Sequence, residues 1–106
     1  MKFTISDNDL RAEGGKALAE ALKDNTIMKE LNIANNNLSY DADANTDMSG
    51  IIAISDAIPT MGAMATITFG DKQAVTMTTT MTEADFSGKL KGYEAHIVAA
   101  FLPKCQ

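Results

Sequence analysis

The sequence predicts a short α/β solenoid, in which parallel strands stack side by side and helices cover one face of the sheet. Residues 28–38 repeat the apolar and asparagine pattern of residues 3–10, with matching positions 28 residues apart. The residues that follow the first pattern have the periodicity of an amphipathic helix. A unit of this size cannot bury its own apolar face, so adjacent units must complete the core.

The first two units each supply one strand and one helix. The first unit has a strand over residues 1–5 and a helix over residues 12–23, in which the leucines lie on one stripe and the charged residues elsewhere. The second unit has a strand over residues 30–34 and a helix over residues 49–58. Ser49 is the expected N-cap of this second helix.

The later units depart from the regular step. Phe69, the next matching strand position, lies 36 rather than 28 residues beyond Ile33, so we expect an insertion of about eight residues within the polar stretch 39–47. The third strand covers residues 65–69. Residues 75–81 are rich in Val and Thr, which favours extended backbone over helix.

The last unit is expected to close the core. Its strand is predicted at residues 84–86, and its helix at residues 93–102. Tyr93, Ile97 and Phe101 are spaced by four, so this helix can cover the open end of the apolar core.

The first two units resemble a known family of repeats. The 28-residue step and the helix at residues 14–22 are similar to the leucine-rich repeat of the ribonuclease-inhibitor-like subclass, as is the strand motif Leu31-x-Ile33-x-x-Asn36-x-Leu38. The resemblance implies a right-handed solenoid with a parallel sheet on the inner face and helices on the outer face. In that family an Asn side chain of each unit bonds to backbone groups of the turn, and Asn8 and Asn36 match that position.

On this resemblance we interpret residues 1–106 as one leucine-rich-repeat domain of four units. The units cover about 1–27, 28–63, 64–80 and 81–106, and the last unit is a C-terminal cap. Asn36→Ala is expected to cost about 1–3 kcal/mol, because buried amides of the turn lose their acceptor.

The composition narrows the range of partners. The chain has 106 residues and a formal net charge of −5, with 45% hydrophobic and 22% charged residues, as expected for one globular domain. Its scattered basic residues argue against nucleic-acid binding, and no apolar run approaches the ~18 residues needed to span a bilayer. The first segment lacks the apolar region of a signal peptide, which favours a cytoplasmic location.

One acidic segment has the residue types of a metal site. Thr46 and Ile52 stand where an EF-hand calcium loop needs Gly and a bidentate Glu, so we expect no metal and interpret the segment as a solvated insertion that faces the next helix N-terminus. Calcium binding is the alternative. Four oxygen-bearing residues alternate here as at the start of such a loop: Asp41, Asp43, Asn45 and Asp47.

No catalytic or cofactor-binding group is expected. His96 is the only imidazole and Cys105 the only cysteine, so the sequence shows no paired nucleophile and base. An internal disulfide is impossible with one cysteine. We therefore predict a protein that is not an enzyme and holds no cofactor.

If the strands stack as predicted, their alternation places one set of polar side chains on the inner face. This face is the usual binding surface of such solenoids, and here it is small, polar and slightly acidic. We expect a protein partner to bind there through eight residues: Lys2, Thr4, Glu30, Asn32, Thr66, Thr68, Glu83 and Asp85.

The function predicted from these features is a non-enzymatic interaction scaffold of leucine-rich-repeat type. It meets its protein partner through the inner face or through the acidic insertion. The alternative is an architectural or capping fragment of a longer repeat array without a ligand of its own. Self-association through the N-terminal edge strand is left open, because unpaired amides of an edge strand can pair with another chain.

Overall fold

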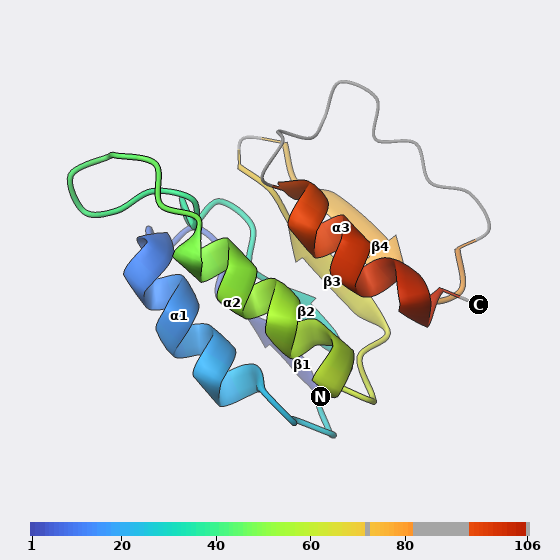
Figure 1. Cartoon of the computed structure of the whole chain (residues 1–106). Helices are drawn as coiled ribbons and strands as arrows, with labels where there is room; N and C mark the ends of the chain where they lie inside the picture. Colours follow the sequence, from blue (N-terminus) through green and yellow to red (C-terminus); the bar gives the residue numbers. More distant parts are fainter. Residues whose placement is uncertain (72, 82–93, 106) are drawn as a thin grey trace.

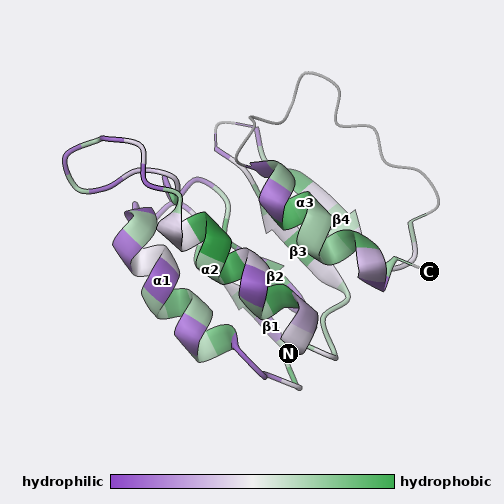
Figure 2. Ribbon diagram, viewed as in Figure 1, coloured by the Kyte–Doolittle hydropathy of each residue, from purple (hydrophilic) through white to green (hydrophobic). Residues whose placement is uncertain are grey.

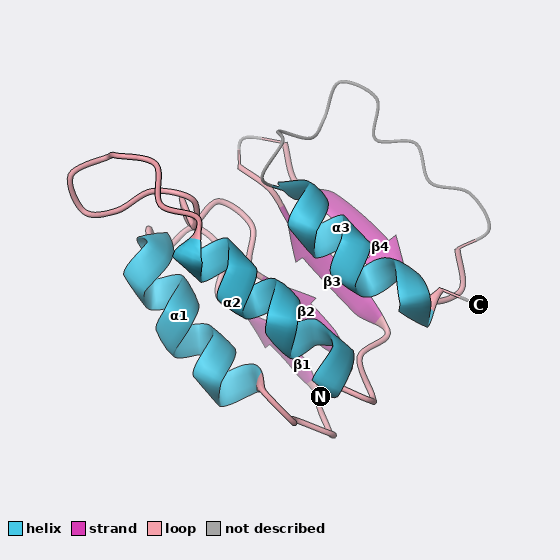
Figure 3. Ribbon diagram, in the orientation of Figure 1, coloured by secondary structure: helices cyan, strands magenta, loops and turns pink. Residues whose placement is uncertain are grey.

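The computed structural model describes residues 1–71, 73–81 and 94–105, and in this part of the chain three helices cover one face of a four-stranded sheet (Figure 1). None of these helices lies on the opposite face of the sheet (Figure 3). The elements follow one another in the order β1 Lys2–Thr4, α1 Arg11–Leu22, β2 Glu30–Asn32, α2 Ser49–Ala57, β3 Thr66–Phe69, β4 Val75–Thr78 and α3 Ala95–Phe101, with short 3-10 turns at Ile58–Thr60 and Leu102–Lys104.

The sheet is mixed, with strand order β1-β2-β3-β4. β1, β2 and β3 run parallel, and their register aligns Phe3 with Leu31 and Leu31 with Ile67. This register confirms the steps of 28 and 36 residues that the sequence pattern predicts. β4 runs antiparallel to β3, with Phe69 opposite Val75.

The prediction of a right-handed leucine-rich-repeat solenoid with an all-parallel sheet is wrong. After β3 the chain turns back at Gly70 and pairs with β3 as β4, so no crossover helix separates the third strand from the fourth. Parallel neighbours need a connection of a dozen residues or more, whereas a hairpin needs only a few. The sheet is not curled into a solenoid, and the chain forms a small α/β fold with a Cα radius of gyration of 12.7 Å.

Gly70 makes the turn after β3 possible. Its φ is +106°, a conformation that side chains with a Cβ rarely adopt. A Cβ at this position would lie 2.7 Å from the carbonyl oxygen of Gln73. The hairpin between β3 and β4 therefore depends on a residue without a side chain.

The turns after β1 and β2 repeat the same backbone conformation. Asp7 and Asn35 have φ angles of 60° and 58°, and Asp9 and Asn37 have φ angles of 51° and 52°. Asp and Asn tolerate this left-handed region better than most residues. The 28-residue repeat of the sequence is thus also a repeat of the backbone.

Asn36 joins these two turns. Its side chain is fully buried, and its Nδ2 donates to the carbonyl oxygens of Ile5 and Ile33, both at 3.0 Å. Its Oδ1 accepts the backbone N–H of Asn8 at 2.8 Å. The expected bonding of the Asn side chain to turn backbone is confirmed at this position.

Helices α1 and α2 pack against each other through two glycines. A Cβ on Gly15 would lie 3.1 Å from Gly50 Cα, and a Cβ on Gly50 would lie 2.7 Å from the carbonyl oxygen of Ala12. The two backbones therefore approach more closely than side chains would allow. This contact fixes the spacing of the helices above β1 and β2.

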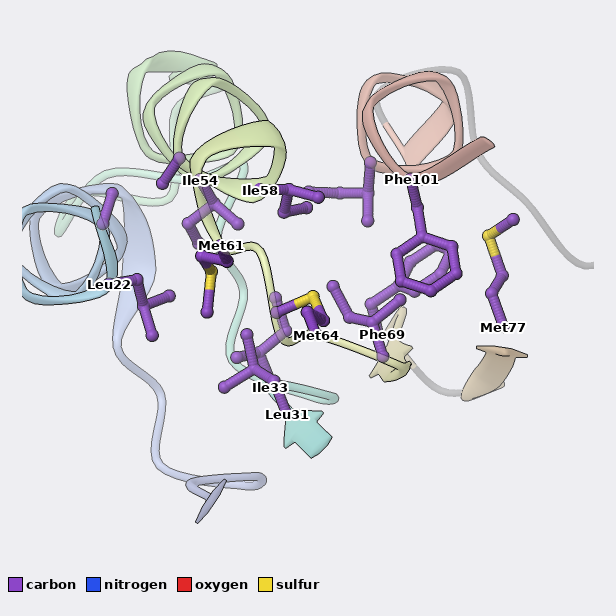
Figure 4. Close-up of a cluster of buried hydrophobic side chains, with 14 of the residues drawn as sticks. Leu22, Leu31, Ile33, Ile54, Ile58, Met61, Met64, Phe69, Met77 and Phe101 are labelled. Atoms are coloured by element: carbon purple, nitrogen blue, oxygen red, sulfur yellow. The ribbon is translucent and has the colours of Figure 1, made fainter. Parts of the chain in front are cut away.

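Among the described residues, one apolar cluster fills the space between the helices and the sheet (Figure 4). α2 contacts both α1 and α3, and its ribbon is more hydrophobic than that of α1 (Figure 2). The final predicted helix is confirmed as α3, whose Ile97 and Phe101 are buried, while Tyr93 and the expected strand at 84–86 lie outside the described residues. Four methionines with at most 4% exposure help fill the core: Met28, Met61, Met64 and Met77.

Candidate functional site

The helix-free face of the sheet brings together polar side chains from all four strands. Burial alternates along β3 and β4, so the residues between the core positions point toward this face. The strand register arranges eight residues in two rows, which we call the polar sheet face: Lys2, Glu30, Thr66 and Thr78 in one row, and Thr4, Asn32, Thr68 and Thr76 in the other.

Most of the predicted partner-binding residues lie on the polar sheet face. Glu83 and Asp85 lie outside the described residues. Sequence reasoning expected extended backbone at residues 75–81 but did not pair it with β3, so Thr76 and Thr78 were missed. Their alternation with the apolar Val75 is the signal that identifies them. The six predicted residues that the structure does bring together are Lys2, Thr4, Glu30, Asn32, Thr66 and Thr68.

The polar sheet face is hollowed into an open depression of about 310 Å³, lined by residues from β1 to β4. The hydroxyl oxygens of Thr68 and Thr76 lie 2.9 Å apart, a hydrogen-bonding distance across β3 and β4. The side-chain Oδ1 of Asn32 accepts the backbone N–H of Ala34 at 3.1 Å. These bonds orient the central side chains, so the face presents hydroxyl and amide groups at the strand spacing of about 4.8 Å.

Two carboxylates of the acidic insertion accept hydrogen bonds from residues two to four positions further along the chain. Oδ1 of Asp41 accepts the backbone N–H groups of Asp43 and Asn45, each at 2.9 Å. Oδ1 of Asp47 accepts the backbone N–H of Ser49 at 2.9 Å and its hydroxyl at 2.6 Å. The hydrogen bonds from Ser49 hold the pKa of Asp47 below its ordinary value.

The insertion does not assemble its four oxygen-bearing residues into a ligand set. Within residues 1–71, 73–81 and 94–105, no group of three or more His, Cys, Asp or Glu side chains is placed to hold a metal ion. The expectation that Ser49 caps α2 is wrong, because Met48 occupies the N-cap position and Ser49 is the first helical residue. The side chain of Asp47, which precedes the helix, instead accepts the backbone N–H of the first helical residue.

A second polar cluster lies in the turns after β1 and β2, and sequence reasoning did not identify it. Oδ1 of Asp9 accepts from Nδ2 of Asn37 at 2.9 Å and lies 3.1 Å from Nε of Arg11. These contacts, the Asn37 hydrogen bond first, lower the pKa of Asp9. Asp71 Oδ1 accepts the backbone N–H of Asn37 at 3.2 Å, and Arg11 Nη1 donates to the carbonyl of Asp41 at 2.7 Å. The cluster therefore ties neighbouring turns together.

His96 and Cys105 differ in their exposure to solvent. His96 is exposed on α3. Cys105 is half-buried, and its Sγ contacts the carbonyl oxygens of Thr78 at 3.6 Å and Phe101 at 3.9 Å. The thiol thus packs against the outer side of β4.

Comparisons of the chain with protein-family models, curated proteins and solved structures found no match. In the part of the chain that the structure describes, no helix has both the length and the apolar character to cross a bilayer.

Proposed function

We propose that the protein is a non-enzymatic interaction module that binds a protein partner through the polar sheet face. The observation that carries the proposal is the depression of about 310 Å³ on the side of the sheet that no described helix covers. The partner is a protein segment with basic and hydrogen-bonding side chains. We keep the cytoplasmic location expected from the sequence as part of this proposal.

The chemistry of the face supports this type of partner. Its threonines and Asn32 offer hydroxyl and amide groups that both donate and accept hydrogen bonds. Glu30 is exposed on β2 and supplies a carboxylate near the middle of the face. The chain as a whole carries a formal charge of −5, which favours approach of a basic partner.

The lining also indicates the strength of the interaction. Trp, Tyr and Arg anchors dominate the energetics of tight interfaces, and the residues that line the depression include none of them. We therefore propose a reversible interaction governed by hydrogen bonds and charge, with an affinity that falls as salt concentration rises.

The test compares three variants that make the same charge change at different places. Glu30→Lys reverses the charge on the polar sheet face, Asp43→Lys reverses a charge in the acidic insertion, and Glu20→Lys does so on exposed α1. Each immobilised variant and the unmodified chain are incubated with extract of the source cell, and captured proteins are quantified by mass spectrometry. A captured protein is then purified, and its affinity for each variant is measured.

The proposal predicts that Glu30→Lys weakens binding by about tenfold or more, while Glu20→Lys and Asp43→Lys bind as the unmodified chain does. Loss of binding in Asp43→Lys alone would place the contact in the insertion. Equal binding by all three variants would show that the polar sheet face is not the site.

The alternative is an architectural role without a ligand. The outer edge of β1, which pairs with no strand of the described residues, favours this second function. It predicts that no protein is captured selectively by the unmodified chain over Glu30→Lys.

A further inference from the structure

The two edges of the sheet are not equivalent. On β1, backbone groups of Ile5 and of Met1 bond to β2, as in Ile5 N–H to Asn32 O and Glu30 N–H to Met1 O. Because bonding groups alternate along a strand, the N–H and C=O groups of Lys2 and Thr4 point to the other side. In the described part of the chain no strand lies there.

The length of this open edge is defined by Asn8. The next outward-pointing carbonyl group along the chain is that of Ser6. Its oxygen already accepts a hydrogen bond from Nδ2 of Asn8 at 3.0 Å. The open edge therefore consists of Lys2, Phe3 and Thr4, with Phe3 at its centre.

The β4 edge is partly closed. The carbonyl oxygen of Thr78 accepts the backbone N–H of Met81 at 3.3 Å and lies 3.6 Å from Sγ of Cys105. An incoming strand would have to displace these contacts. The β4 edge is thus a poorer template for strand pairing than the β1 edge.

The helix above β1 has an uncharged outer flank. Gly15 of α1 contacts Gly50 of α2, so this side of the helix faces its neighbour. A stripe at positions i, i+3, i+4 and i+7 lies on the flank turned away from α2, and Ala17 and Ala21 on it are exposed. The full stripe is Gly14, Ala17, Leu18 and Ala21.

Partly buried apolar side chains continue this surface toward the sheet. Phe3 of β1 and Leu18 of α1 both pack at the margin of the core, and Met1 is 57% exposed. At the β1–α1 end of the molecule, an apolar surface therefore lies beside unpaired backbone groups of β1. The α1 stripe carries no charged side chain, so two copies of this surface would not repel each other through like charges there.

We propose that this end binds a second copy of the chain, with the two β1 strands antiparallel around a two-fold axis at Phe3. Lys2 of each copy then pairs with Thr4 of the other, and these pairs exchange about four backbone hydrogen bonds. The two Phe3 residues face each other, and the α1 stripes pack together through their small side chains. A two-fold contact of this kind uses the same surface of both copies, so the assembly closes at the dimer. A head-to-tail filament would need the β4 edge as the second surface, and that edge is partly obstructed.

The first test is the mass of the whole chain in solution. Light scattering after size exclusion, over a range of concentrations, should approach twice the monomer mass of 11.3 kDa as the concentration rises. A chain that remains monomeric at the highest soluble concentration overturns the proposal. Masses that keep growing beyond the dimer also overturn it, because a two-fold contact closes.

A matched pair of variants then locates the surface. Ala17→Glu places a carboxylate in the stripe of each copy and should raise the dimer dissociation constant by about tenfold or more. Ala99→Glu makes the same change at an exposed position of α3 and should leave dimerisation unchanged. Circular dichroism checks that both variants fold. Equal dimerisation of the two folded variants overturns the proposal.

Cross-linking tests the register. In the background Cys105→Ser, Lys2→Cys and Thr4→Cys chains are mixed and oxidised, since residues of a directly opposed pair have Cα atoms about 5.5 Å apart and can form a disulfide. The mixture should give covalent dimer, and each variant alone should give much less. Cross-linking that is as efficient within one variant as in the mixture overturns the proposed register.

Discussion

The turn after β2 and the turn after β3 follow strands with the same alternation but send the chain in different directions. Leu31 and Ile67 are equivalent core positions, aligned in the sheet. After β2 the chain passes through the Asn36 turn and rises into α2, whereas after β3 it passes Gly70 and returns as β4. Strand alternation therefore determines which residues enter the core, while the turn that follows the strand determines the topology.

The sequence contains the reason for this difference. Lys72 stands 36 residues beyond Asn36, at the position where a third turn of the same type would need Asn. A Lys side chain cannot accept a hydrogen bond, so it cannot reproduce the contact that Asn36 makes with the backbone N–H of Asn8. The Val- and Thr-rich residues that follow favour a strand.

The largest effect is expected from Asn36→Ala. This change removes the acceptor of the Asn8 N–H and the donor to the carbonyl oxygen of Ile33, while the carbonyl oxygen of Ile5 keeps its bond from Nδ2 of Asn8. Because the lost bonds lie at a fully buried side chain, we expect a loss near the upper end of the range, about 3 kcal/mol in free energy of unfolding. Urea unfolding followed by circular dichroism measures it. Asn8→Ala is the control, because Asn8 is exposed and water can replace its contacts, for a loss of about 1 kcal/mol or less. Equal losses would show that the buried turn contacts contribute nothing special.

Gly70→Ala tests the turn after β3. The substituted residue must hold a φ of +106° with its Cβ against the carbonyl of Gln73, so we expect a loss of about 2 kcal/mol. Amide hydrogen exchange should rise first in β3 and β4 rather than in β1 and β2. Gly62→Ala is the control, because its added Cβ has no atom within 4 Å apart from those of its own residue and its two chain neighbours, so the stability should stay unchanged. A uniform rise of hydrogen exchange across all four strands would contradict the expectation that the β3–β4 hairpin opens separately from β1 and β2.

The smallest effect concerns pH. The pKa of Asp47 is lowered from its ordinary value of 3.8, so its hydrogen bonds stabilise the folded state above that pH, and this contribution is lost as the pH falls through the lowered pKa. Asp47→Asn should therefore make unfolding less dependent on pH in this acidic range. Asp43→Asn removes the same charge from the same loop without touching that hydrogen bond, and serves as the control. Unfolding midpoints between pH 5 and pH 2, about where carboxylates titrate, measure the difference.

The sequence predicts much of the fold because several of its signals are local. Alternation places Leu31 and Ile67 in the core, and the period of the last helix places Phe101 there. The direction of β4 does not follow from alternation, because a strand has the same two-residue period in a parallel and an antiparallel pair. The all-parallel interpretation failed at this point, and Thr76 and Thr78 were missed with it.

The candidate site is predictable to a similar extent. Six residues of the polar sheet face follow from alternation and register, since each lies next to an apolar residue of its strand that points to the helix side of the sheet. Contacts between turns, such as Asp9 with Asn37, depend on the conformations of two separate loops and have only their 28-residue spacing as a signal. The role of Asp47 as acceptor at the start of α2 requires knowing where that helix begins.

The acidic insertion leaves and re-enters the body of the molecule at one place. Tyr40 and Thr46 form an isolated antiparallel bridge, and the backbone N–H of Asp47 donates to the carbonyl oxygen of Ser39 at 2.7 Å. The two ends of the loop are thus held together by backbone hydrogen bonds, while its tip at residues 42–45 is exposed. A reporter sequence or an affinity tag whose own ends lie close together can be spliced into that tip, which gives an attachment point away from both the sheet and its edges.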